Sequence, residues 1–160
     1  SVGYIEQGQS LHVEITIKGL EKDIFIGNTL VDMYAQCASL EEACRTFSFL
    51  RIKTVVSWSA LIGGYAQYGC SLKALQLFID MHQDGIEPDE VSFLILLKAC
   101  MSLGDVKQGV LMHHEITWSV FLPNVNTMNA ILDMYAKLKQ PLHRANLLFI
   151  HQIGGMSIHI

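Results

Sequence analysis

Apolar residues in this chain recur at the spacing of a helix rather than at the spacing of a strand. Between residues 58 and 66 they stand at positions i, i+3, i+4, i+7 and i+8, which places them on one helical face. These residues are Trp58, Leu61, Ile62, Tyr65 and Ala66. Gly69 follows, as expected where a helix ends in the left-handed conformation. Because strand-like alternation is absent throughout, the pattern predicts an all-α fold.

A second helix is expected directly after the first, with Ser71 as its N-cap. Its apolar positions are Leu72, Leu75, Leu77, Phe78 and Met81. Gly85 and the turn at residues 87–89 are expected to end it. The same order returns later in the chain, with Gly104 between two helices and Asp105 as the next cap. Each unit is therefore predicted to be a helical hairpin.

The hairpin pattern repeats along the chain. Three segments align, Asn28-Thr-Leu-Val-Asp-Met-Tyr-Ala-Gln, Ser59-Ala-Leu-Ile-Gly-Gly-Tyr-Ala-Gln and Asn129-Ala-Ile-Leu-Asp-Met-Tyr-Ala-Lys, and their starts lie 31 and 70 residues apart. A further unit at Leu94, 35 residues after Ser59, fills the longer interval. Internal periods of this length are typical of repeat proteins.

An independent segment reports the same period. Gln7-Gly8 and His12 recur as Gln108-Gly109 and His113, 101 positions later, and the shift from Asn28 to Asn129 is also 101. Hairpins this short bury their apolar faces only by stacking on neighbours, which predicts an α-solenoid. Small residues are expected where helices approach closely, at Gly64, Ala66, Ala99 and Ala136. The recurring aromatics are predicted to be core rather than a cofactor site, namely Phe47, Phe78 and Phe149.

Composition limits the possible classes of protein. Of the 160 residues 51% are hydrophobic and 16% charged, which fits a folded domain rather than a disordered chain. No apolar stretch has the roughly 20 residues of a membrane span, and the first residues resemble neither a signal nor a transit peptide. The cysteines contain no C-x-x-C pair, so we expect buried, reduced thiols rather than structural zinc at Cys37, Cys44, Cys70 and Cys100.

The sequence offers little catalytic or metal-binding chemistry. His113 and His114 are adjacent, whereas helical zinc ligands prefer i, i+4 spacing. Because His12 occupies the equivalent repeat position, a packing role is predicted for His113. Asp32 and Asp133 are equivalent repeat positions too, rather than a paired acid and base. No enzyme activity, cofactor, metal or small-molecule substrate is therefore expected.

Residues 56–67, followed by Ala74-Leu-Gln-Leu-Phe and Gly85-Ile-Glu-Pro-Asp, resemble the standard motif of the pentatricopeptide repeat proteins of plant organelles. The alternating lengths resemble the P-L-S subclass, and the period of 34 in the related tetratricopeptide repeats fits less well. Because the chain starts and ends within repeats, we expect a piece of a longer array in residues 1–156. The units expected are 1–23 (partial), 24–54, 55–89, 90–124 and 125–156, with 157–160 as the start of a further unit or a tail.

The resemblance implies a right-handed superhelix that recognises about one base of single-stranded RNA per repeat. In the family, a residue one turn into the first helix works with the last residue of the repeat. Carried onto this chain, these base-reading pairs are Asn28 with Thr54, Ser59 with Asp89, Leu94 with Asn124, and Asn129 with Met156. Residues that pack against the bases would be Phe25, Val56, Val91 and Asn126. The implied preference from Asn28 onward, 5′ to 3′, is pyrimidine, G, unspecified, pyrimidine.

This chain departs from the family pattern at several positions. Leu94 lacks a hydrogen-bonding group, Met156 replaces a polar partner, and Asn126 is a poorer packing surface than Val or Phe. Ala38 stands where the family prefers glycine between helices, which strains the backbone. Only Ser59 with Asp89 is a complete pair.

The resemblance also implies a mitochondrial or chloroplast location and a role in organellar RNA editing or maturation. RNA-editing factors and other repeat proteins are further candidate partners, and a membrane partner is not expected. The formal net charge of −4 counts against binding through phosphate charge alone. RNA binding would then depend on base contacts or on a local basic stripe at residues such as Lys53 and Lys98. The alternative function is a protein-interaction scaffold that contacts no RNA.

Overall fold

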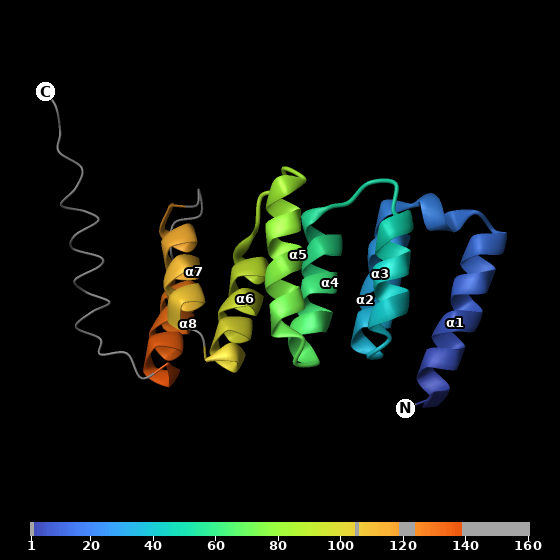
Figure 1. The fold of residues 1–160 in the computed structure, drawn as a ribbon. Coiled ribbons are helices and arrows are strands. Elements are labelled where there is room, and N and C mark those ends of the chain that lie inside the picture. Colours follow the sequence, from blue (N-terminus) through green and yellow to red (C-terminus); the bar gives the residue numbers. More distant parts are fainter. Residues whose placement is uncertain (1, 105, 119–123, 139–160) are drawn as a thin grey trace, which may run out of the picture.

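The computed structural model describes residues 2–104, 106–118 and 124–138. The predictions for Asp105, Phe149 and Met156, and for the chain beyond Leu138, lie outside these residues. Within them the chain is all-helical, as predicted (Figure 1). The helices are α1 (Val2–Ile17), the short 3-10 helix η1 (Leu20–Lys22), α2 (Ile24–Gln36), α3 (Leu40–Phe49), α4 (Val55–Gln67), α5 (Ser71–Gln83), α6 (Glu90–Leu103), α7 (Val106–Trp118) and α8 (Val125–Lys137).

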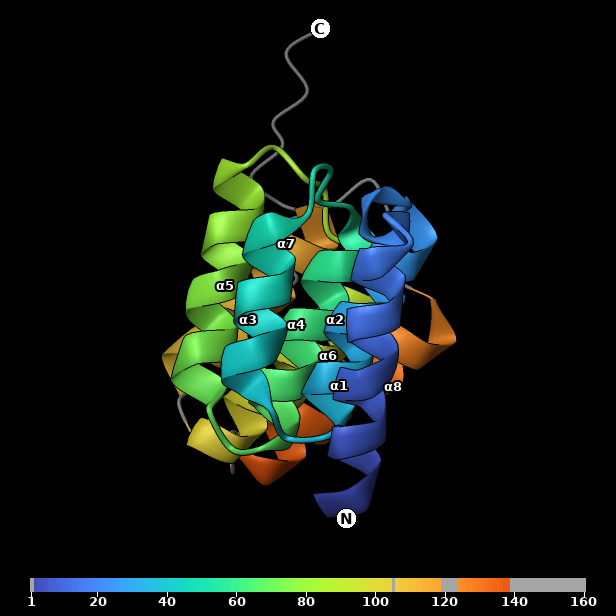
Figure 2. The ribbon, with the colours of Figure 1, turned by 90° about the vertical axis from the view of Figure 1, so that its right-hand side faces the viewer.

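The helices form a row of hairpins in chain order. The starts of α2, α4, α6 and α8 are separated by 31, 35 and 35 residues. Each of these helices contacts the next of its kind, and α3, α5 and α7 pack beside them. Seen along the row, α3 and α5 lie on one side and α2 and α8 on the other (Figure 2). This arrangement is an α-solenoid with one row of helices along each face.

Residues with a left-handed backbone conformation separate the helices. Gly69, Gly85 and Gly104 have φ values of 79°, 73° and 64°, as the sequence predicts for the ends of helices. Ala38 also has a positive φ, 61°. The predicted N-cap at Ser71 is wrong, because Ser71 is the first residue inside α5 and its buried hydroxyl has no hydrogen-bond partner among the described residues.

One continuous core runs between the two rows. Phe47 packs edge-on against Trp58 with ring centroids 4.6 Å apart, and Phe78 packs against Phe93 at 6.0 Å. Both repeated phenylalanines are therefore core residues, as predicted. Leu72 is an exception, since it is 73% exposed. Cys100 is the cysteine that is fully buried, whereas Cys70 is exposed and Cys37 and Cys44 are half-buried.

One side-chain contact, between a histidine and a tyrosine, occurs twice in the chain, 101 residues apart. His12 Nδ1 lies 2.8 Å from the Tyr34 hydroxyl, and His113 Nδ1 lies 3.0 Å from that of Tyr135. Burial raises the pKa of both tyrosines, with the charge of Glu42 a second cause at Tyr34. Burial, and then the charge of neighbouring His114, lowers the pKa of His113. These contacts support the packing role predicted for the histidines.

Within residues 2–104, 106–118 and 124–138, no helix has the length and apolar character needed to cross a membrane. No group of three or more His, Cys, Asp or Glu in that part of the chain is arranged to hold a metal ion.

Candidate nucleic-acid interface

A groove of about 820 Å³ runs along one face of the solenoid, across α2, α4 and α6. Each of these three helices contributes residues from its first, middle and last turns. The lining residues are Phe25, Asn28, Thr29, Asp32, Gln36, Val56, Ser59, Ala60, Gly63, Ala66, Gln67, Asp89, Val91, Ile95, Lys98 and Ser102. Six of the twelve residues predicted to recognise or pack against bases lie together in this groove.

An apolar side chain stands at the entrance of the groove on each of the three helices. Phe25, Val56 and Val91 are the second residues of α2, α4 and α6, and they are 80%, 57% and 54% exposed. A large exposed apolar side chain repeated at equivalent positions is a binding feature rather than a core feature. The residue predicted for the same role on α8, Asn126, is exposed and donates to Glu90 Oε1 at 3.4 Å.

The first predicted pair is in direct contact. Asn28 is 8% exposed, and its Nδ2 donates to Thr54 Oγ1 at 3.1 Å. Nδ2 is thus the end of the amide that faces Thr54. The other end, Oδ1, is buried and has no hydrogen-bond partner among the described residues. Because a buried, unpaired acceptor is costly, this oxygen is suited to accept a hydrogen bond from a ligand.

The second predicted pair is connected through a residue that the sequence analysis did not single out. The Ser59 hydroxyl lies 2.8 Å from the Ser92 hydroxyl, and the Ser92 hydroxyl lies 2.8 Å from Asp89 Oδ1. Because the Asp89 carboxylate only accepts, Ser92 donates to it and Ser59 donates to Ser92. The oxygen of Ser59 and Oδ2 of Asp89 then remain available as acceptors.

The last residue of each predicted unit also begins the next helix. Thr54, Asp89 and Asn124 are the N-caps of α4, α6 and α8, and each accepts from a backbone N–H three residues ahead. The donors are the backbone N–H groups of Ser57, Ser92 and Thr127. The spacing of Ser, Thr, Asp or Asn with a hydroxyl residue three positions later resembles a capping box, so the sequence carried a signal for this role.

The remaining predicted pairs are Leu94 with Asn124 and Asn129 with Met156. Leu94 is half-buried on α6. Asn124 is the N-cap of α8, and its Oδ1 accepts a hydrogen bond from the Thr127 backbone N–H. Asn129 lies on the exposed surface of α8, outside the lining of the groove. Its predicted partner Met156 lies outside the described residues.

The charge of the groove is mixed. Its described charged residues are Asp32, Asp89 and Lys98. Lys53 lies instead over the ring of Phe47, with Nζ 5.5 Å from the centroid. The predicted basic stripe is therefore limited to Lys98 within the described groove.

Comparison with known proteins identifies the repeat. The profile of the PPR repeat family matches residues 53–102. A mitochondrial pentatricopeptide repeat-containing protein of Arabidopsis thaliana is 37% identical over 136 residues, and a second one is 38% identical over 136 residues. A chloroplastic one from the same plant is 34% identical over 109 residues. The chain is built of pentatricopeptide repeats.

These pentatricopeptide relatives are much longer than this chain. The two mitochondrial alignments cover 85% of this chain but 13% and 22% of the relatives, and the chloroplastic alignment covers 68% and 13%. Their compartments agree with the predicted organellar location. The crystal structure of the pentatricopeptide repeat protein PPR10 from maize matches 84% of this chain and 20% of its own, with a TM-score of 0.66 and 22% identity. The match confirms the solenoid fold.

Proposed function

We propose that these pentatricopeptide repeats bind single-stranded RNA in the groove, with about one base per repeat. The observation that carries the proposal is the groove itself, which collects an exposed apolar residue and a polar side chain from each of two successive repeats, Phe25 with Asn28 and Val56 with Ser59. Unstacked bases are recognised by packing against side chains and by hydrogen bonds to their Watson–Crick edges. This groove offers both kinds of contact at regular intervals.

The hydrogen bonds around Ser59 favour guanine at the second repeat. Ser59 Oγ and Asp89 Oδ2 are two acceptors near one another, since Ser92 connects the two side chains. Guanine presents two adjacent donors, N1–H and N2–H₂, on its Watson–Crick edge. Adenine and cytosine present a donor beside an acceptor, and uracil presents a single donor, so each would leave one acceptor without a partner.

The arrangement at Asn28 favours a pyrimidine at the first repeat. Its Oδ1 is the free acceptor, and uracil N3–H or cytosine N4–H₂ can donate to it. The amide is longer than the hydroxyl of Ser59 and leaves less room for a purine. The full proposal, 5′ to 3′ from the repeat at residues 24–54, is pyrimidine, G, unspecified, pyrimidine, with the repeats bounded as expected from the sequence.

A test exchanges the first polar residue of the best pair. Ser59→Asn should shift the preference at the second base from G toward a pyrimidine, changing the G-to-U affinity ratio by about tenfold, since one well-formed base contact contributes about 1–3 kcal/mol of discrimination. Fluorescence anisotropy with short RNAs that differ only at that base measures the ratio. Ser48→Asn, at an exposed position on α3, is the matched control. An unchanged ratio in a folded Ser59→Asn variant would show that Ser59 does not recognise the base.

In the whole protein, we propose that this binding serves RNA editing or maturation in a mitochondrion or chloroplast. The second candidate is a protein-interaction scaffold, and the observation that favours it is the mixed charge of the groove, with Asp32 and Asp89 facing one lysine. Binding that is absent at low salt for every RNA tried would favour the scaffold.

A further inference from the structure

A second cleft, of about 460 Å³, lies between α1, η1, α2 and α3. It uses Gly27 and Leu30 of α2, whereas the RNA groove uses other residues of that helix, and the two share no lining residue. The cleft lies between α1, the helix of the partial first unit, and the hairpin formed by α2 and α3.

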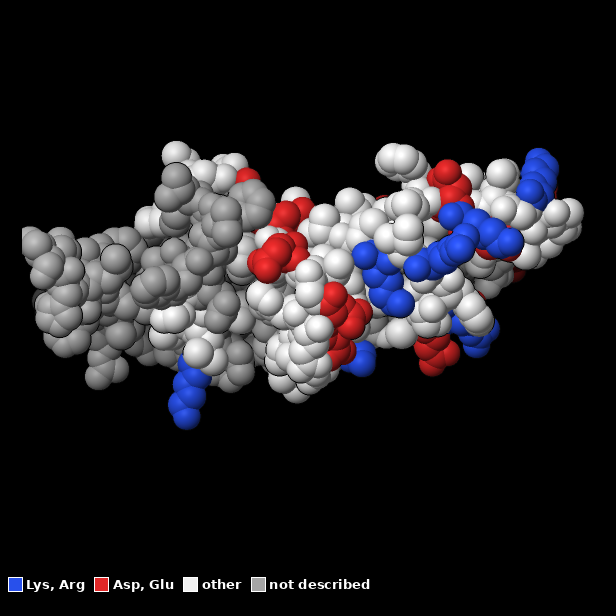
Figure 3. Space-filling view, turned by 90° about the horizontal axis from the view of Figure 1, so that it is seen from above, with Lys and Arg blue, Asp and Glu red and all other residues white. Residues whose placement is uncertain are grey.

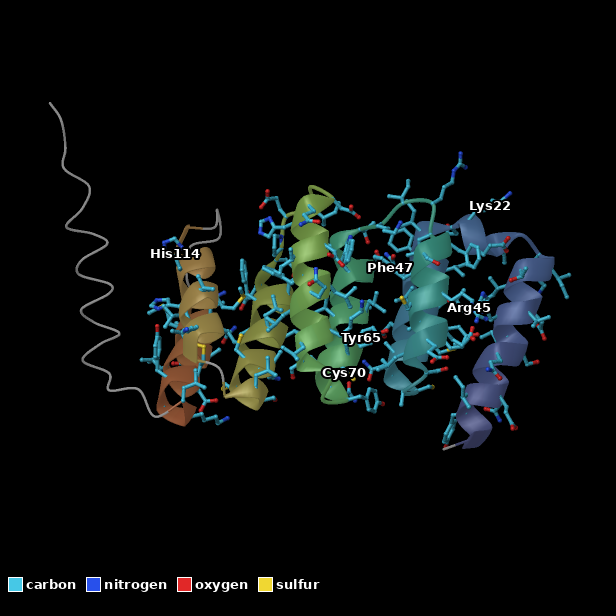
Figure 4. The ribbon with its side chains drawn as sticks, viewed as in Figure 1. Lys22, Arg45, Phe47, Tyr65, Cys70 and His114 are labelled. Atoms are coloured by element: carbon cyan, nitrogen blue, oxygen red, sulfur yellow. The ribbon has the colours of Figure 1, made fainter. Side chains whose placement is uncertain are left out.

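The cleft is lined by apolar residues and by charged ones, with three cations and two carboxylates among the latter. Leu30, Leu50 and Phe49 line it, and Phe49 is 81% exposed. Lys22, Arg45 and Arg51 stand around them. In Figure 4, Arg45 lies between α3 and α1, and Figure 3 shows that Lys and Arg gather over the α1–α3 end of the upper surface.

Two carboxylates in the cleft are in different situations. Glu42 Oε1 pairs with Arg45 Nη1 at 3.1 Å. The other two lining cations, Lys22 and Arg51, have no ion pair among the described residues. Oε2 of Glu21 is buried and has no hydrogen-bond partner in the described part of the chain. A buried carboxylate oxygen without a donor is unfavourable, so an occupant that brings an N–H group to Glu21 would be stabilised.

The charges of the cleft are not a requirement of repeat packing. His12 and Tyr34 recur 101 residues later as His113 and Tyr135 and make the same contact. At that same shift, Glu21 and Lys22 correspond to Leu122 and Pro123 in the sequence. Among the polar lining residues, His12 and Thr16 thus recur as His113 and Thr117, whereas the charges of Glu21 and Lys22 do not recur.

We propose that this cleft docks a short acidic segment of a partner protein. A bulky apolar side chain of the segment would pack on Leu30 and Leu50 beside Phe49. Carboxylates on either side would meet Lys22 and Arg51, and a backbone N–H of the segment would donate to Glu21 Oε2. Glu21 and Glu42 would repel an RNA strand, because RNA carries a phosphate at every nucleotide. A peptide can carry its carboxylates only opposite Lys22 and Arg51.

The test uses two fluorescein-labelled, end-capped peptides, Glu-Leu-Phe-Asp and its charge-reversed form Lys-Leu-Phe-Lys, with fluorescence anisotropy on the whole chain. The acidic peptide should bind and the basic peptide should not. The double variant Lys22→Glu, Arg51→Glu should weaken binding by about tenfold or more, since rim charges change from attraction to repulsion. Lys73→Glu on α5, outside the cleft, is the matched control. Phe49→Ser, at an exposed position, should also weaken binding.

The proposal would be overturned if the two peptides bound equally well or if neither bound. It would also be overturned if the double variant bound the acidic peptide as tightly as the unchanged chain does. A short oligouridine that displaces the acidic peptide, and whose own binding is lost in the double variant, would assign the cleft to RNA instead. Because the groove shares no residue with the cleft, RNA selectivity at Ser59 is measured independently, and either proposal can fail alone.

Discussion

At the scale of single residues, Ala38 shows how the turn between the two helices of a hairpin is constrained. It has φ 61° and is the one non-glycine with a positive φ in the described chain, whereas the corresponding turns use Gly69 and Gly104. A left-handed conformation is unfavourable for any residue with a Cβ atom. Ala38 is exposed, so its methyl group recovers little of this cost through packing.

Ala38→Gly should therefore stabilise the chain by about 0.5–1 kcal/mol. The substitution removes the backbone strain of the folded state, and this gain is partly offset because glycine increases the conformational entropy of the unfolded chain. Urea unfolding followed by circular dichroism measures the change. Gly69→Ala is the matched control and should destabilise by a similar amount, because a Cβ there meets nothing within 4 Å and only the backbone is strained. A destabilised Ala38→Gly variant would contradict this account of the turn.

At the scale of elements, α2 and α4 cross closely at one small residue. A Cβ added to Gly64 would lie 2.7 Å from Ala35 Cβ and 3.3 Å from Leu40 Cδ2. The sequence predicts that adjacent helices approach each other closely at Gly64, Ala66, Ala99 and Ala136. Ala99 is buried, but Ala136 is exposed, and the partner Ala35 was missed. Which small residues face a neighbouring helix depends on the angle at which the helices cross.

Gly64→Ala should destabilise the chain by up to about 2 kcal/mol, since overpacking costs about 1–3 kcal/mol and the gain in helix propensity returns about 1 kcal/mol. Gly63→Ala is the control, because its Cβ would meet only Ile95 Cδ1, at 3.4 Å. That variant should be neutral or slightly more stable. Thermal unfolding of both variants checks the difference, and equal destabilisation would show that the crossing is not tightly packed.

At the scale of the whole molecule, the distribution of charge decides how RNA would be held. The chain has a net charge of −4, and the described groove has one cation, Lys98, beside Asp32 and Asp89. Binding through phosphates releases counterions and depends steeply on salt. Binding through base edges and packing does not.

We expect the affinity for the cognate RNA to fall only weakly with salt. The logarithm of the binding constant plotted against the logarithm of the salt concentration should have a slope of about −0.7, the value for one phosphate contact on a single strand. Lys98→Gln should flatten it further. Affinity measured across a salt series checks this, with Lys73→Gln on α5 as the control. A slope several times steeper would show that cations elsewhere in the protein hold the phosphates.

The sequence by itself determined the hairpin, its spacing and the direction in which its apolar faces point. These follow from local rules, since helical periodicity, left-handed glycines and the 101-residue recurrence are all visible along the chain. It also identified Asn28 with Thr54 as a pair, through resemblance. It failed at Ser71, where the expected hydroxyl cap does not form, and it did not single out Ser92.

Only the tertiary structure decided what lies between units. It placed Ser92 between Ser59 and Asp89, oriented the amide of Asn28, and showed that Lys53 covers Phe47 rather than lining the groove. It also formed the second cleft from α1, η1, α2 and α3. These features depend on how one hairpin is rotated against the next. That rotation is set by contacts between residues distant in sequence, such as Gly64 with Ala35, which no local pattern specifies.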